Sequence, residues 1–119
     1  MEDYKLFDAE FRLMNIIWEL EPVNSTALWM ECERRLGWKK PTTYTMLRKL
    51  CERGMLQNES ATVTALVGRE QVQRYESEAL LEKAFDNSLP SFIATFLKDR
   101  KLTKEEAAEL ERLIREAAK

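Results

Sequence analysis

The sequence predicts a mainly α-helical protein with one short β-hairpin, and three observations lead to this fold class. Amphipathic helical patterns fill residues 8–53, a short β-branched segment follows at residues 55–67, and helical spacing of apolar residues returns from residue 70 onward. The chain has 119 residues, of which 45% are hydrophobic and 34% charged. This is the composition of a folded protein, so global disorder is not expected.

The first two helices are predicted from apolar spacing and from the residues at their ends. In residues 8–20 apolar residues recur at steps of three and four, and Asp8 is placed to cap the N-terminus. Pro22 ends this helix because proline disfavours a helical conformation in the residue before it. A second helix is expected to start near Asn24 and to run to Leu36, where a glycine follows. Its expected inward residues are Leu28, Trp29 or Cys32, and Leu36.

A third helix is predicted from Pro41 to Arg53, because proline suits the first turn of a helix and Gly54 provides a stop after the last turn. Its expected inward residues are Thr43, Met46 or Leu47, and Leu50. The remaining positions of this helix are mostly hydroxyl-bearing or basic, so its outer face is polar.

Residues 55–67 are predicted to form a β-hairpin. β-Branched alternation at residues 62–64 (Thr-Val-Thr) indicates a strand, and residues 58–60 (Asn-Glu-Ser) indicate a tight turn before it. Three helices followed by a hairpin are the layout of a winged helix-turn-helix, in which the last helix enters the major groove of DNA. We therefore predict a winged-helix DNA-binding domain with a short hairpin wing over residues 1–68.

Residues 69–119 are predicted to form a helical dimerisation domain. A helix is expected from Glu70 to about Asn87, a break at residues 88–91, an apolar segment after it, and a last helix that starts at Thr103. So short a helical segment rarely buries its apolar faces alone, so pairing with a second copy is expected. The residues expected in that contact are Leu80, Phe85, Phe92, Ile93, Phe96, Leu110, Leu113 and Ile114. Packing within one chain is the alternative, and the sequence leaves both open.

Positive charge is concentrated in one segment, although the net charge of the chain is −2. Residues 34–54 hold seven basic side chains and one acidic one, whereas residues 1–33 hold two basic and eight acidic ones. Local charge determines where a polyanion such as double-stranded DNA can dock. The expected DNA-binding residues are Lys39, Lys40, Thr42, Thr43, Tyr44, Thr45, Arg48 and Lys49.

These residue types suit a helix in the major groove. Arginine recognises guanine edges, threonine contacts phosphates or the thymine methyl group, and lysines at a helix entrance bind phosphates. The alternative is an ordinary solvated helix face. Two aromatic residues stay ambiguous: Tyr44 points clearly neither to the core nor to the groove, and an exposed Trp29 would indicate a contact surface.

Several function classes are excluded by what the sequence lacks. It has no histidine, so histidine-based nucleophile pairs and metal sites are absent. Its two cysteines, Cys32 and Cys51, have no metal-ligand spacing, and its three glycines cannot build a phosphate-binding loop. We therefore expect no enzyme, no metal and no cofactor. With no apolar run long enough to span a membrane and no signal peptide at the N-terminus, a cytoplasmic protein without membrane insertion is expected.

Taken together, the motifs resemble the penicillinase-repressor family of winged-helix transcriptional regulators. Residues 6–18 carry its Ala-Glu, Met and Trp pattern, residues 38–54 are similar to its recognition helix, and residues 75–78 and 85–96 are similar to its dimerisation tail. The resemblance covers roughly residues 6–115.

The resemblance implies a homodimeric repressor on palindromic operators, typically of a β-lactam-resistance operon. Members of the family are released from DNA when a membrane sensor protease pathway leads to cleavage of an Asn-Phe bond in the tail. The matching positions here are Thr95 and Phe96, so the asparagine is missing. The sequence also lacks the C-terminal cysteines of the copper-responsive branch, and its wing, residues 57–67, has no basic residue. A winged-helix protein-interaction module without DNA binding is the alternative function.

Overall fold

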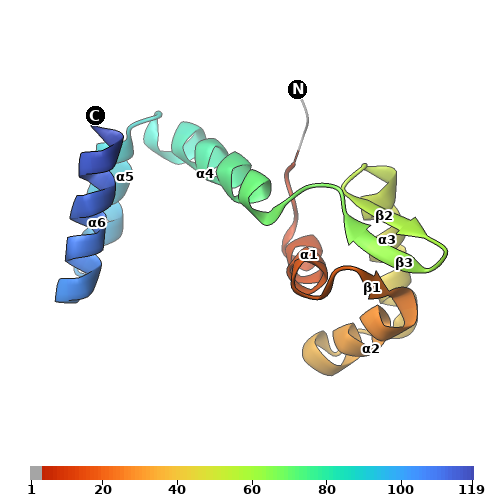
Figure 1. Cartoon of the computed structure of the whole chain (residues 1–119). Helices are drawn as coiled ribbons and strands as arrows, with labels where there is room; N and C mark the ends of the chain where they lie inside the picture. Colours follow the sequence, from red (N-terminus) through yellow and green to blue (C-terminus); the bar gives the residue numbers. More distant parts are fainter. Residues whose placement is uncertain (1–3) are drawn as a thin grey trace. The chain divides into compact units, whose positions relative to one another are not determined.

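The computed structural model describes residues 4–119 and confirms the mainly α-helical class with a winged-helix layout (Figure 1). The elements, in order, are α1 (Asp8–Leu20), β1 (Val23–Asn24), α2 (Ser25–Leu36), α3 (Lys40–Glu52), β2 (Leu56–Glu59), β3 (Thr62–Ala65), α4 (Arg69–Phe85), α5 (Leu89–Leu97) and α6 (Lys104–Ala117). Residues 1–3, at the start of the predicted first domain, lie outside the described residues. The chain forms two compact units, with the division between Ala79 and Leu80.

The first unit contains a three-stranded antiparallel sheet in the order β1-β3-β2. In the hairpin, Gln57 pairs with Thr64 and Glu59 pairs with Thr62. The prediction of a turn at residues 58–60 was therefore wrong by about one residue, because the turn consists of Ser60 and Ala61, both with positive φ. A two-residue turn with two positive φ angles matches the twist of the strands that it connects.

The strand β1 was not predicted. It has only two residues, and Val23 pairs with Val63 of the hairpin. Both valines are buried, so this pairing connects the segment between α1 and α2 to the sheet. The pairing continues in a hydrogen bond of 2.8 Å from the Ser25 amide to the Ala61 carbonyl, which places the start of α2 beside the turn of the wing.

One hydrophobic core joins the three helices and the sheet of the first unit. Its fully buried side chains include Leu13, Met14, Ile17, Leu28, Leu50 and Val63. The sequence left open which residues of two helices point inward. In α2, Cys32 is buried and Trp29 only half-buried. In α3, Leu47 is buried and Met46 only half-buried. The core therefore fixes which face of α3 points outward.

Two predicted helix ends differ in the structure. Asp8 is the first residue of α1 and not its cap; the N-cap is Phe7, whose amide donates a 2.8 Å hydrogen bond to the Glu10 carboxylate. The predicted break at residues 88–91 was too long, because Ser88 caps α5 and the following residues already form its first turn. Proline is tolerated there because the first amides of a helix have no partner within it.

The second unit contains the end of α4 together with α5 and α6. The Phe92 ring packs edge-on against Phe85 at 5.3 Å between ring centroids and lies 5.7 Å from the Phe96 ring. Thr103 caps α6 in a reciprocal arrangement with Glu106, as the sequence predicted. From residue 80 to residue 119 no side chain is buried. Among residues 4–119, no helix has both the length and the apolar character required to cross a lipid bilayer.

Candidate nucleic-acid interface

The structure separates the seven basic residues between positions 34 and 54 into two groups. Three arginines pair with carboxylates: Arg34 with Glu31, Arg35 with Glu19 and Glu31, and Arg53 with Glu10. The other four basic side chains are exposed and make no ion pair within residues 4–119; they are Lys39, Lys40, Arg48 and Lys49. The unneutralised positive charge of this segment therefore lies on α3 and at its entrance, where the sequence predicted DNA contacts.

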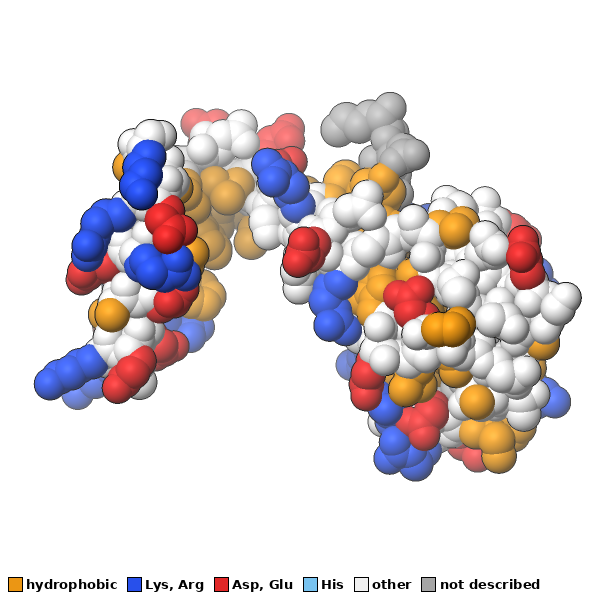
Figure 2. Space-filling view, in the orientation of Figure 1, with side chains coloured by type: hydrophobic (Ala, Val, Ile, Leu, Met, Phe, Trp, Pro, Cys, Tyr) orange, Lys and Arg blue, Asp and Glu red, His pale blue; other side chains and the backbone are white. Residues whose placement is uncertain are grey.

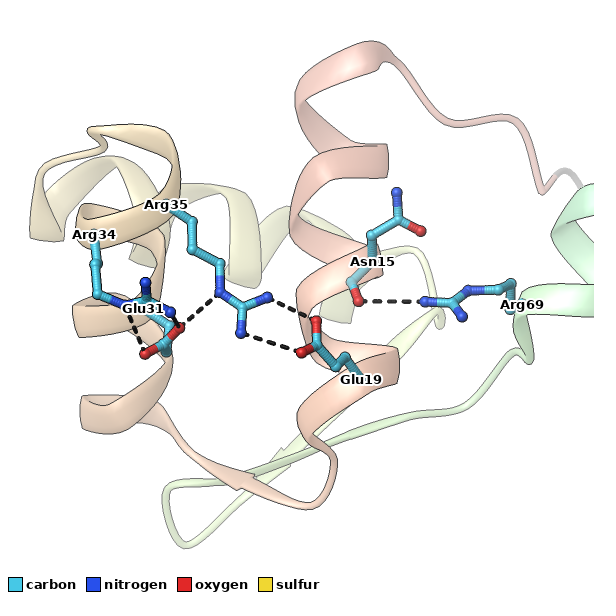
Figure 3. A network of polar contacts seen from close by, with 6 residues as sticks. All are labelled: Asn15, Glu19, Glu31, Arg34, Arg35 and Arg69. Atoms are coloured by element: carbon cyan, nitrogen blue, oxygen red, sulfur yellow. Dashed lines mark hydrogen bonds and ion pairs between the residues drawn. The ribbon is translucent and has the colours of Figure 1, made fainter.

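Of the paired arginines, Arg35 connects the first two helices (Figure 3). The Arg35 guanidinium on α2 lies 2.7 Å from a Glu19 oxygen on α1 and 2.7 Å from a Glu31 oxygen on its own helix. Hydrogen bonds from arginine lower the pKa values of both glutamates below their ordinary value of 4.5. At neutral pH both carboxylates are therefore charged and neutralise the arginines, which leaves these side chains in a structural role.

The placement of α3 divides its predicted site residues by face. Thr42, Thr45, Arg48 and Lys49 are exposed on the outer face of α3. Thr43, by contrast, is only 1% exposed and faces the core, so it cannot reach DNA and is left out of the proposed contacts. This is a consequence of helical spacing: Thr43, Leu47 and Leu50 lie at steps of four and three residues on one face.

Tyr44 lies between these two faces. Its ring is half-buried and its hydroxyl is 3.5 Å from the Ser25 hydroxyl at the start of α2. The Lys40 ammonium lies 5.9 Å from the centre of this ring and 5.4 Å from the centre of the Trp29 ring on α2. Trp29 was not predicted as a site residue, because the proximity of α2 to the start of α3 is a tertiary contact that local patterns do not show.

The C-terminal end of α3 is fixed by an ion pair to α1. Arg53 donates hydrogen bonds of 3.2 Å to both oxygens of Glu10, which is buried, and a further hydrogen bond to the Lys5 carbonyl. Because Glu10 also accepts the Phe7 amide, one carboxylate holds both the start of α1 and the end of α3. Arg53 is thus occupied within the protein and does not belong to the outer basic face.

Among the described residues, neither a metal site nor a reactive thiol accompanies the exposed basic residues of α3. Within residues 4–119, no group of three or more cysteine and carboxylate side chains is arranged to hold a metal ion. Burial raises the pKa values of the Cys32 and Cys51 thiols, which disfavours reactive thiolates. What remains on the outer face of α3 is a set of hydroxyls and cations, which suits binding to a polyanion.

Comparison with known proteins agrees with this arrangement. The family model for the penicillinase repressor matches residues 6–116, which is nearly the whole chain. The chain belongs to the penicillinase repressor family. This is a family of transcriptional repressors and not of enzymes.

Two similar relatives illustrate the family. The penicillinase repressor of Bacillus licheniformis is 25% identical over 116 residues, which cover 94% of this chain and 91% of the relative. The methicillin resistance regulatory protein MecI of Staphylococcus aureus is 22% identical over 115 residues, which cover 93% of this chain and 94% of the relative. MecI of Mammaliicoccus sciuri matches to the same extent.

The wing of this chain carries little charge. Between residues 56 and 65 the only charged side chain is Glu59, which is exposed near the turn. A wing of this composition offers no cation to a phosphate group. The electrostatic part of any DNA binding therefore depends on α3 and its entrance.

Proposed function

We propose that this repressor binds operator DNA as a homodimer and inserts α3 of each protomer into the major groove. The observation that carries the proposal is the concentration of four unneutralised, exposed cations on α3 and at its entrance, while three nearby arginines are paired within the protein. In this proposal residues 1–68 bind DNA and residues 69–119 dimerise.

The outer face of α3 supplies two kinds of contact. Arg48 is suited to hydrogen bonding with a guanine edge, and the hydroxyls of Thr42 and Thr45 lie on the same exposed face. Lys39, Lys40 and Lys49 are suited to phosphate contacts, which orient the helix on the duplex without reading its sequence. A two-fold axis between protomers would place two such helices on the halves of a palindromic operator.

The second unit supports the dimer part of the proposal. None of its side chains is buried, and several large apolar ones are exposed. The residues in the proposed contact are Leu80, Phe85, Phe92, Ile93, Phe96, Leu110, Leu113 and Ile114, of which Phe85 and Phe92 are half-buried within the unit. Figure 2 shows hydrophobic side chains exposed on the surface of this unit. Burial of these side chains against a second copy would supply the hydrophobic core that the second unit lacks on its own.

The names of the relatives suggest what is regulated. A penicillinase repressor and methicillin resistance regulators point to a β-lactam-resistance operon. Release by a membrane sensor protease pathway would act at the Thr95-Phe96 bond, which lies in α5 with both side chains exposed. A cut there would separate α6, with Leu110, Leu113 and Ile114, from the DNA-binding unit.

The test is a titration of labelled DNA from the upstream region of the chain's own gene, followed by fluorescence anisotropy at two salt concentrations. We expect binding tighter than to random DNA and weaker at higher salt, and Arg48→Ala should weaken it about tenfold. Arg34→Ala is the matched control, because Arg34 is exposed but paired with Glu31 and should change the affinity little. Equal, weak binding to both DNAs in all variants would contradict the proposal and favour a protein-interaction module.

A further inference from the structure

The Lys40 side chain is held in an unusual way for an exposed lysine. It is the first residue of α3, and its ammonium lies 5.4 Å from the centre of the Trp29 ring and 5.9 Å from the centre of the Tyr44 ring. Both distances are within the range of cation–π attraction, in which the negative face of an aromatic ring attracts a positive charge. One ring comes from α2 and the other from the next turn of α3.

The two rings are themselves held in place. Both are half-buried, and Trp29 stands in α2 directly after the fully buried Leu28 and three residues before the fully buried Cys32. The Tyr44 hydroxyl is 3.5 Å from the Ser25 hydroxyl, so its ring lies against the start of α2. A lysine between fixed rings loses conformational freedom before it meets a ligand, whereas a free lysine must lose that freedom on binding.

The Lys40 ammonium can still bind an anion despite its contacts with the two rings. No carboxylate within residues 4–119 forms an ion pair with it, and its side chain is exposed. It stands at the N-terminal end of α3, where the first amides of the helix also favour an anion. Lys39, one residue earlier, is exposed too but has no aromatic ring within cation–π distance among the described residues, so the two neighbouring lysines differ in preorganisation.

We propose that Trp29, together with Tyr44, is a positioning residue that holds the Lys40 ammonium for contact with a DNA phosphate at the entrance of α3. This inference rests on the proposed function, because it names a phosphate of the operator as the ligand. It adds a residue of α2 to the DNA-binding surface. Trp29 acts through Lys40 in this arrangement and does not itself need to touch DNA.

The test is a double-mutant cycle on the full chain with Trp29→Leu, Lys40→Ala and the combination, measured on the DNA that the wild type binds. Trp29→Leu should weaken binding of the dimer about four- to 25-fold when Lys40 is present, because each of the two protomers loses a cation–π contact that accounts for about two- to fivefold. It should have no effect when Lys40 is already alanine. Lys40→Ala should also reduce the slope of log affinity against log salt by about 1.8, because each protomer of the dimer loses one phosphate contact and each contact contributes about 0.9.

Two control variants separate positioning from structure. Trp29→Phe retains an aromatic face and should retain most of the affinity. Trp29→Leu combined with Lys39→Ala should show additive losses, because Lys39 has no ring contact. If circular dichroism shows that Trp29→Leu is unfolded, the cycle is run with Trp29→Met, whose flexible unbranched side chain adapts to an irregular space and has no ring.

The measurements distinguish failure of the positioning role from failure of the proposed function. If Trp29→Leu weakens binding equally with and without Lys40, or does not weaken it at all, the positioning role is wrong while the proposed function stands. If the wild type does not bind its upstream DNA more tightly than random DNA, the proposed function fails and this inference fails with it.

Discussion

At the scale of single residues, the buried carboxylate of Glu10 connects the start of α1 to the end of α3. It is 7% exposed, accepts the Phe7 amide at 2.8 Å and lies 3.2 Å from the Arg53 guanidinium. A buried charge is tolerated when it is paired and hydrogen-bonded, and removal of the partner leaves its desolvation cost uncompensated. The stability of the first unit should therefore depend on Arg53 more than on other surface arginines.

We predict that Arg53→Ala lowers the free energy of unfolding by about 1–3 kcal/mol, because Glu10 is left buried without its cation. Urea denaturation followed by circular dichroism measures the change. Arg74→Ala is the control: Arg74 pairs with Glu78 at 3.3 Å, but both side chains are exposed, so the loss should stay below about 0.5 kcal/mol. Equal losses in the two variants would contradict the special role of the buried pair.

The sequence predicted which residues of α3 are exposed where helical spacing alone decides the direction of a side chain. Thr42, Thr45, Arg48 and Lys49 lie on the exposed face of α3 as their spacing indicated. Spacing also showed that Thr43 points inward, although its hydroxyl resembles those of the outer threonines. The contact of Lys40 with the Trp29 ring and the pairing of Arg53 with Glu10 could not be predicted, because each partner lies on another helix.

At the scale of elements, the wing turn holds two residues other than glycine in a left-handed backbone conformation. Ser60 and Ala61 have φ angles of 50° and 64°, in the left-handed region that glycine and asparagine prefer. The Ala61 side chain gains nothing from burial, since this residue is exposed. The geometry is maintained by the strands on either side and by the bond from the Ser25 amide to the Ala61 carbonyl.

We predict that Ala61→Gly raises the free energy of unfolding by about 1 kcal/mol, because glycine removes the clash of Cβ in the left-handed conformation. The same substitution at Ala27, an exposed position in α2, should lower it by about 0.5–1 kcal/mol, because glycine is unfavourable within a helix. Urea denaturation of both variants provides the comparison. A loss of stability in both would show that the turn is not strained.

Elements with strong local patterns were predicted to within one or two residues. The last helix begins where its capping box indicated, and α1 and α2 have the expected bounds. The strand β1 was missed because two residues cannot show alternation, and it exists only through its pairing with β3. The error at Asp8 is a shift of one residue: Phe7 takes the N-cap position, where its side chain makes no cap hydrogen bond, and Glu10, the third residue of the helix, accepts the Phe7 amide.

At the scale of the whole molecule, the two units differ in how they bury apolar surface. The first unit has a continuous core of fully buried side chains, whereas no side chain of the second unit is buried. Several leucines, isoleucines and phenylalanines of α5 and α6 are exposed instead. Monomeric proteins rarely expose so many apolar side chains on one short segment, and such surfaces mark protein interfaces. This exposed surface supports the proposed dimer, in which a second copy would cover it symmetrically.

We predict that Leu113→Asp converts the proposed dimer into a monomer at micromolar concentration, because a charge on the exposed apolar face of α6 would be buried unpaired in that dimer. Sedimentation velocity measures the state of assembly, and the first unit should keep its helical circular dichroism signal. Operator affinity should fall by about 100-fold or more, since two linked half-site contacts become one. The matched control is Leu66→Asp, which places the same charge at an exposed leucine of the first unit and should leave the dimer intact. If both variants remain dimeric, the apolar face of α6 does not form the contact, and the covering surface must lie elsewhere on the chain.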